Sequence, residues 1–319
     1  MKSKIRSPFF YVGDKYKLMP QLEKLFPVNI NNYYEPFVGG GSSFLNTEAK
    51  NFFLNDINEY IIQLHCYLQS FRESKDKFFE SLFRTIEKYG LSCSFLGKIV
   101  PDELKKEFIK TYYSRYNKEN YMKMREDYNK NKSNFELLYL LLIYGFNHMI
   151  RFNLKGEFNL PVGNVDFNKN VYNALNNYFD FSKKNNLNFF NQDYKEFLIN
   201  RYFEKNDFVY LDPPYLISNS EYNKIWNEKN EEELYQILEG IDNQDVKFGL
   251  SNLVIHKDKK NEILLDWMKK YKVYEVNSNY ISRFDNTRKI NSREVYVTNY
   301  EKEKIREKTI IVFDNYEKS

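Results

Sequence analysis

The tetrapeptide Asp212-Pro213-Pro214-Tyr215 has the residue types needed to hold a flat heterocycle by an exocyclic amine. It directly follows Phe208–Leu211, a short apolar run that predicts a buried strand. The prolines exclude a helix, remove two N–H donors and favour extended backbone at the residue before each. The carboxylate and a backbone carbonyl can then accept from an amino group while the tyrosine ring stacks. A strand-end turn with a solvent-facing aspartate is the alternative that these four residues leave open.

A second set of candidate residues lies around three glycines that follow Tyr33–Phe37, a predicted strand. Gly39–Gly41 lets the backbone approach a ligand closely. Ser42 or Ser43 is placed to cap a following helix, whose N-terminus would offer unpaired N–H groups. Pyrophosphate is one candidate ligand, but Phe44 stands at the third glycine position of the dinucleotide fingerprint. The loop therefore predicts a ligand site without deciding the ligand.

Asp56 follows the next apolar stretch, Asn51–Leu54. An acid at the tip of the second strand of a doubly wound sheet is well placed to bind ribose hydroxyls. The same side chain could instead cap the helix predicted at Ile57–Ser70. Taken together with the glycine loop, Asp56 is better explained as a ligand-binding residue than as a helix cap.

Composition indicates a globular protein with a mild positive charge. The 319 residues include 28 Tyr and 28 Phe, which supply ample apolar area, and the net charge is +4. This charge permits nucleic acid as a partner without requiring it. The cysteines and histidines, Cys66, Cys93, His65, His148 and His256, form no metal-ligand pattern, so neither a metal nor a disulfide framework is expected. The first residues lack the apolar core of a signal peptide, and no apolar run approaches about 18 residues, so a soluble cytoplasmic protein is expected.

The middle of the chain lacks the alternation of strands and loops found on either side. Amphipathic helices are predicted at residues 59–88, 102–127 and 135–145. The strand pattern resumes after Asn188 and continues with helices near 231–240 and 258–270 and strands at 247–251, 272–276 and 294–299. We therefore predict an inserted, mainly helical domain at residues 59–187, within a discontinuous α/β domain formed by residues 1–58 and 188–319.

The end of that insert, residues 144–164, is rich in Asn, Phe, Arg, Lys and Gly. Amide and guanidinium groups recognise base edges, and flat aromatic rings can wedge between base pairs. A surface hairpin with its turn at Lys155-Gly156 explains the same residues equally well.

The order of these motifs resembles the Dam-like class of DNA adenine-N6 methyltransferases. The resemblance rests on EPFVGGGS at residues 35–42, the long insert and DPPY at residues 212–215, and it covers most of the chain. It implies a doubly wound, Rossmann-like methyltransferase sheet with an inserted, mainly helical DNA-recognition domain. It also implies S-adenosylmethionine as cofactor, double-stranded DNA as partner, and an adenine that is flipped out of the duplex. Transfer would be a direct displacement on the methyl group, with Asp212, Pro213, Pro214 and Tyr215 holding the base.

The resemblance carries over to individual residues. Tyr11, Gly13 and Lys15 match an N-terminal motif that closes over the cofactor, and Asp193 matches an acid that approaches the cofactor adenine. Capping of the helix after Asp193 is compatible with that role. The complete expected cofactor set is Tyr11, Gly13, Lys15, Pro36, Phe37, Gly39, Gly41, Ser42, Asp56, Asp193, Tyr194 and Asp212.

In the family, a segment similar to residues 144–164 enters DNA. Phe146 matches the residue that slips into the duplex, Asn147 its neighbour and Arg151 the base-recognising arginine, while Asn153 and Lys155 are expected contacts. Two positions depart from the family pattern. His148 replaces the usual glycine, which predicts a different loop shape, and Phe10 replaces a lysine found in members that modify GATC. The second departure disfavours GATC and leaves room for another short site, such as one that contains ATG.

Several alternatives remain at this point. Cytosine-N4 methylation needs the same hydrogen bonds to an exocyclic amine, but its enzymes more often carry serine in place of Asp212. Protein-glutamine or RNA methylation leaves the insert unexplained. A nicotinamide oxidoreductase accounts for the glycine loop and Asp56 but not for DPPY, and a DNA-binding protein without catalysis is disfavoured because all motif positions are filled. A cognate restriction endonuclease is a possible partner, and a monomer is expected.

Three further segments carry weaker predictions. Residues 216–230 are expected to close over DNA, and the basic residues within 277–293 to hold phosphates. Residues 308–314 are expected to add an edge strand or to lie outside the family core.

Overall fold

A computed structural model describes residues 4–218, 226–277 and 292–301. The chain forms two compact units, each built from separate segments. Unit 1 comprises residues 1–16, 39–45 and 58–185, and unit 2 comprises residues 17–38, 46–57 and 186–319. Each unit is described by itself.

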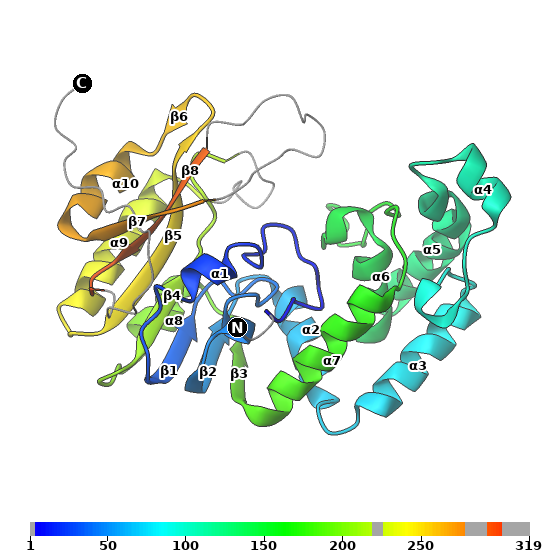
Figure 1. The fold of residues 1–319 in the computed structure, drawn as a ribbon, viewed down its shortest axis with the longest axis horizontal. Helices are drawn as coiled ribbons and strands as arrows, with labels where there is room; N and C mark the ends of the chain where they lie inside the picture. The colour runs from blue at the N-terminus through cyan, green and yellow to red at the C-terminus, as the bar shows by residue number, and fades with distance from the viewer. Residues whose placement is uncertain (1–3, 219–225, 278–291, 302–319) are drawn as a thin grey trace. The chain divides into compact units, whose positions relative to one another are not determined.

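Unit 2 contains one mixed sheet with the strand order β3-β2-β1-β4-β5-β8-β7, and β6 pairs with β5 (Figure 1). Its strands are β1 Ile30–Glu35, β2 Ala49–Asn55, β3 Asn186–Phe190, β4 Phe208–Leu211, β5 Lys247–His256, β6 Lys259–Lys260, β7 Lys272–Val276 and β8 Ser292–Thr298. The first five strands of the order are parallel, and β8 runs antiparallel to both of its neighbours. The fold is α/β with a mostly parallel sheet, as the Rossmann-like expectation required.

Both faces of the sheet in unit 2 are apolar, which explains the continuous apolar runs of its inner strands. All four residues of β4 are buried. One face packs against the helices α8 Tyr194–Ile199, α9 Glu228–Asp242 and α10 Glu262–Trp267. The other face carries aromatic rings: Phe26, just beyond α1 Met19–Leu22, packs against Phe208 and Tyr210 with ring centroids 5.1 and 4.9 Å apart.

The sheet of unit 2 reverses its winding between β1 and β4. From β1 the chain proceeds outward through β2 to β3, and from β4 it proceeds the other way to β5. In open parallel sheets, ligands bind in the crevice outside the carboxyl ends of the strands at such a switch point. The residues that follow β1 and β4 are therefore the first candidates for a site.

Unit 1 is mainly helical (Figure 1). Its helices are α2 Glu59–Ser70, α3 Lys75–Lys88, α4 Asp102–Glu107, α5 Tyr112–Lys130, α6 Phe135–Tyr144 and α7 Lys169–Lys184, with short 3-10 turns η2 Ser94–Leu96 and η3 Phe146–His148. Every residue of α6 from Leu137 to Tyr144 is buried, so this helix is apolar on all sides and forms the centre of the unit.

Several sequence predictions about helices are wrong. The glycines lead into a 3-10 turn, η1 Phe44–Asn46, and not into the expected helix. Residues 258–270, expected to be one helix, form β6, α10 and the 3-10 turn η5 Met268–Lys270. Helix α7 was not predicted, although Asn168 caps it and its apolar residues are regularly spaced.

No helix among the described residues is long and apolar enough to cross a membrane. The predictions for residues 308–314, for most of the basic segment 277–293 and for the centre of segment 216–230 lie outside the described residues.

Candidate active site

Four neighbouring strands of unit 2 end in residues that the sequence singled out. Because β3, β2, β1 and β4 are parallel and adjacent in that order, their carboxyl ends lie along one edge of the sheet. Asp193 follows β3, Asp56 follows β2, Pro36 and Phe37 follow β1, and Asp212 follows β4. The structure thus brings all the predicted acids of this unit to a single edge, at the switch point.

Asp212 and Tyr215 are in direct contact. The Tyr215 hydroxyl lies 2.9 Å from Oδ1 of Asp212, and both residues are half-buried. Pro213 is buried and Pro214 half-buried. The strand end therefore presents a carboxylate beside an aromatic ring, as the tetrapeptide predicted.

The Tyr215 hydroxyl also lies 2.9 Å from Oε1 of Glu294, a residue of β8 that sequence reasoning missed. Glu294 is 1% exposed. A second missed acid, Glu35 at the end of β1, is equally buried and accepts a hydrogen bond from Tyr33. The available signal was an acid inside an apolar strand pattern, since such a residue is almost never buried without a partner.

Asn55, the last residue of β2, ties three strand ends together and was also missed. Its side-chain Nδ2 donates to the carbonyls of Pro36 and Gln192 at 3.1 and 3.0 Å, and its Oδ1 accepts from the Gln192 N–H at 2.9 Å. The side chain is fully buried. Asn55 therefore fixes the loops that carry Pro36, Asp56 and Asp193.

Replacing Asn55 by alanine should lower the free energy of unfolding by about 2–4 kcal/mol, because it leaves buried backbone groups without partners. Urea unfolding followed by circular dichroism measures the change. Asn51→Ala in the same strand is the control, since its side chain pairs with Asn32 and Asn186 near the surface, and it should cost less than about 1 kcal/mol. Equal losses in the two variants would contradict the proposed role of Asn55.

An aromatic group stands beside the acids in unit 2. The Phe37 ring lies 5.2 Å from that of Tyr194 and 5.7 Å from that of Trp226, centroid to centroid. The Trp226 Nε1 donates to the buried carboxylate of Glu231 at 2.6 Å, which fixes the indole. Tyr194 and Trp226 are buried and Phe37 is half-buried, so Phe37 is the ring of this group that a flat ligand such as adenine could contact.

Helix capping was an alternative role for both Asp193 and Asp56, and the structure shows it for only one of them. Asp193 is the N-cap of α8, because its Oδ1 accepts from the Lys195 N–H at 2.8 Å. Asp56 does not cap the helix that follows it; Asn58 does, by accepting from the Tyr60 N–H at 3.1 Å. The capping explanation of Asp56 is therefore wrong.

In unit 1, Tyr11 packs against the glycine loop. A Cβ on Gly40 would lie 2.9 Å from the Tyr11 Cβ and 3.1 Å from the Ser7 Oγ, so no larger residue fits there. Gly39 and Gly41 have φ values of +46° and +82°, which favour glycine. The structure thus brings together Tyr11, Gly39 and Gly41 of the expected cofactor set.

The other expected cofactor residues of unit 1 are placed differently. Gly13 is exposed in a turn with φ +82°, and a Cβ there would meet open space. Lys15 is 6% exposed and Ser42 3% exposed. Ser42 does not cap a helix, since only η1 follows it.

His65 holds the glycine loop from within unit 1. Its Nε2 lies 2.9 Å from the Gly39 carbonyl, and its Nδ1 lies 3.0 Å from the Tyr178 hydroxyl. A carbonyl can only accept, so Nε2 carries the hydrogen and Nδ1 accepts from the tyrosine. Burial lowers the pKa of His65 from its ordinary value of 6.5 to about 4. The side chain is therefore neutral in the folded protein at pH 7.

This histidine predicts a pH-dependent stability. Between pH 6.5 and about 4 the unfolded chain takes up a proton at His65 while the folded chain does not, so acidification favours unfolding. The contribution should reach about 3 kcal/mol at pH 4 and vanish above pH 6.5. Urea unfolding of the wild type and of His65→Gln at several pH values measures it. An identical pH dependence of stability in the two proteins would contradict the lowered pKa of His65.

Residues 151–159 of unit 1 form the hairpin that the sequence left open as an alternative, with Phe152 bridged to Phe158 and the turn at Gly156. Helix α5 holds this hairpin, since Asn129 bonds both the N–H and the carbonyl of Phe158. Lys155 is exposed at the turn, and the Asn153 Oδ1 accepts from its N–H at 2.9 Å.

Arg151 is not free of partners in this hairpin. Its Nε donates to Oδ1 of Asn159 and its NH2 group to the Asn159 carbonyl, each at 2.9 Å. The guanidinium is half-buried. Direct recognition of a base by this side chain therefore requires that these bonds be exchanged or shared.

Phe10 and His148, the two residues that differ from the family pattern, are in contact with each other. The rings of Phe10 and His148 lie 5.6 Å apart, and both residues have left-handed backbone, with φ values of 51° and 50°. Glycine adopts this conformation readily, so His148 does not itself require a different backbone path. Phe146 is 44% exposed, and Asn147, with φ 54°, is exposed beside it.

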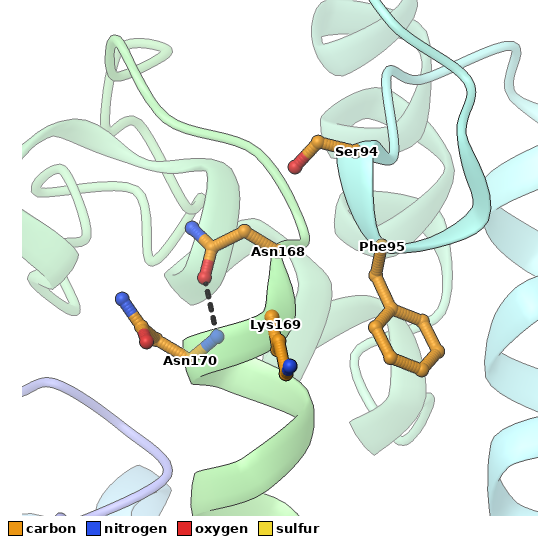
Figure 2. Close-up of a pocket in the computed structure, with 5 residues that line it drawn as sticks. All are labelled: Ser94, Phe95, Asn168, Lys169 and Asn170. Atoms are coloured by element: carbon orange, nitrogen blue, oxygen red, sulfur yellow. Dashed lines mark hydrogen bonds between the residues drawn. The ribbon is translucent and has the colours of Figure 1, made fainter.

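A cavity of about 470 Å³ in unit 1 is lined by Ser94, Phe95, Asn168, Lys169 and Asn170 (Figure 2). None of these residues belongs to the predicted site. The Asn168 side chain is used as the N-cap of α7, where it accepts from the Asn170 N–H at 2.9 Å. We assign this cavity no role in the chemistry.

Comparison with known proteins decides the family. A profile described as D12 class N6 adenine-specific DNA methyltransferase matches residues 11–281. The chain belongs to this family. Membership of the D12 class decides against the nicotinamide oxidoreductase considered above, and it agrees with the resemblance found in the motifs.

Relatives of this D12-class chain include modification enzymes. The type II methyltransferase M.FokI of Planomicrobium okeanokoites is 33% identical over 306 residues, which cover 93% of this chain and 43% of that protein. The modification methylase StsI of Streptococcus sanguinis is 32% identical over 310 residues, covering 94% and 44%. The DNA adenine methylase of Escherichia coli K12 is 28% identical over 208 residues, covering 64% and 63%. The chain thus spans less than half the length of the first two relatives.

Proposed function

We propose that this chain transfers a methyl group from S-adenosylmethionine to N6 of an adenine in a short double-stranded DNA site. The observation that carries the proposal is the order of Asp193, Asp56, Phe37 and Asp212 along one edge of the sheet, with Tyr215 against Asp212. Family membership supports the base and the atom that are modified.

The residues of unit 2 suit the cofactor. Asp56, at the end of β2, offers a carboxylate for ribose hydroxyls, and Asp193 offers one for the adenine amine. The Phe37 ring, against which Tyr194 and Trp226 pack, would supply an apolar face for the adenine ring. We propose that Tyr11, Gly13, Lys15, Pro36, Gly39, Gly41, Ser42 and Asp212 complete the set. When bound, the cofactor supplies a methyl group activated by its sulfonium.

The chain's own residues would position the base. An adenine inside a duplex must first be rotated out, which costs a few kcal/mol. Asp212 and the Pro213 carbonyl would then accept hydrogen bonds from the amino group, which orients its lone pair, and the Tyr215 ring would stack on the base. Positioning and electrostatics supply most of the rate enhancement in such a direct transfer. The proton leaves after the nitrogen has become cationic.

DNA recognition is assigned to residues 59–187, with Phe146, Asn147, Arg151, Asn153 and Lys155 as the contacts. Phe146 is exposed enough to fill the space that the extruded base leaves. We further propose that the chain acts as a monomer on DNA in the bacterial cytoplasm, beside a cognate restriction endonuclease. The relatives M.FokI, a type II methyltransferase, and StsI, a modification methylase, support the modification role.

Tritium transfer tests the proposal. The purified chain is incubated with tritiated S-adenosylmethionine and unmethylated duplex DNA, and the DNA is digested to nucleosides. Tritium should appear in N6-methyldeoxyadenosine. Tritium in N4-methyldeoxycytidine would support the cytosine alternative, and the absence of transfer would leave the chain as a binding protein only.

A further inference from the structure

Glu294 lies in the interior of the sheet in unit 2. It belongs to β8, which is paired on both sides, with Leu253 of β5 and Val276 of β7 opposite Glu294. The pairing with β5 shifts register between Leu253 and Ile255, directly beside this position. Bulges of this kind re-aim side chains and are frequent next to active sites. At 1% exposure, the carboxyl group is almost completely removed from solvent.

Tyr215 connects this carboxyl group to the methyl-transfer site. Its hydroxyl lies 2.9 Å from Oε1 of Glu294 and 2.9 Å from Oδ1 of Asp212. A phenol has one hydrogen to donate and lone pairs with which to accept. The single Tyr215 hydroxyl therefore links the two carboxyl groups.

The two carboxyl groups that Tyr215 contacts lie in acidic surroundings. Burial raises the pKa of the Tyr210 phenol, and the nearby carboxylates of Asp212, Glu35 and Glu294 raise it further, so three acids gather around this ring. Asp212 is half-exposed, whereas Glu294 is buried, so Tyr215 connects an interior acid to the acid at the strand end.

We propose that Glu294 is a positioning residue in a relay of hydrogen bonds: its buried carboxyl group holds the Tyr215 hydroxyl, which also contacts Asp212. This inference rests on the proposed function. The relay fixes both the ring that stacks on the base and the carboxylate that receives the amine, before any substrate binds. Preorganised groups of this kind lose no reorganisation energy during the reaction.

Substitutions of equal length test the relay. Glu294→Met removes the carboxyl group that bonds Tyr215 and should lower kcat by about 10- to 100-fold, with little change in the KM for S-adenosylmethionine. Tyr215→Phe removes the hydroxyl and should cause a similar loss. Glu294→Gln keeps a polar group of the same length that can bond the Tyr215 hydroxyl, and it should keep kcat within about threefold of the wild type. Glu275→Met, which alters an exposed acid on the neighbouring β7, is the control.

The double variant Glu294→Met with Tyr215→Phe separates positioning from structural support. If the residues act through one relay, the double variant should be no slower than the slower single variant. Additive losses, or a Glu294→Gln enzyme as slow as Glu294→Met, would overturn the inference. If Glu294→Met fails to fold, an undiminished kcat in Tyr215→Phe would overturn the inference instead. An inactive wild type would overturn the proposed function together with the relay, whereas an active wild type with unchanged variants would overturn the relay alone.

Discussion

Asp212→Ala is expected to lower the rate of methyl transfer by about 1000-fold or more while the protein stays folded. The variant loses the carboxylate that would orient the amino nitrogen, and losses of this size follow removal of a single preorganised electrostatic group. Folding should be affected little, because Asp212 is half-exposed at a strand end and its hydrogen bond with Tyr215 is worth about 1 kcal/mol.

Single-turnover tritium transfer measures the chemical step, and thermal unfolding measures the fold. Asp266→Ala is the matched control, since its carboxylate on α10 is exposed and pairs with Lys269 at the surface. DNA binding by Asp212→Ala, followed by gel shift, should persist. Turnover within about tenfold of the wild type would contradict the assignment of Asp212.

Arg151→Ala is expected to weaken the preference for the recognition sequence by about 10- to 150-fold, equivalent to about 1–3 kcal/mol for one lost bidentate base contact. The measurement is the ratio of kcat/KM on the cognate site to that on sites with one substituted base pair. A phosphate contact would instead lower binding on all sequences equally.

The hairpin bonds of Arg151 supply the control for that experiment. Asn159→Ala removes the Oδ1 that Arg151 Nε bonds but leaves the guanidinium in place. If Arg151 recognises a base, Asn159→Ala should keep most of the sequence preference. If Arg151 only supports the hairpin, the two variants should lose preference to the same extent, which would contradict its role in recognition.

Local chemistry was predictable where one short segment contained the whole signal. The strand Phe208–Leu211 has the predicted bounds, because an apolar run flanked by polar residues and prolines admits little else. The hairpin turn at Gly156 was one of the two explanations that Lys155-Gly156 left open. The edge shared by Asp56, Asp193 and Asp212 followed from strand order, which the family resemblance implied.

Features that depend on distant pairing could not be predicted. Glu294 lies 79 positions from Tyr215, and Asn55 lies 137 positions from Gln192, so neither contact has a local signature. The helix expected after Gly41 failed for a different reason: a good capping residue does not ensure a helix when the chain that follows is buried and turns at once. The contact of Phe10 with His148 joins two departures that looked independent in the sequence.

The most direct test of the account is to map methylated bases in the DNA of an unmethylated host that expresses this chain. Sequencing that detects modified bases should find N6-methyladenine at one short motif, with none in a host that expresses Asp212→Ala. Methylation on cytosine N4, or no modified base from a chain that is folded and binds DNA, would contradict the account.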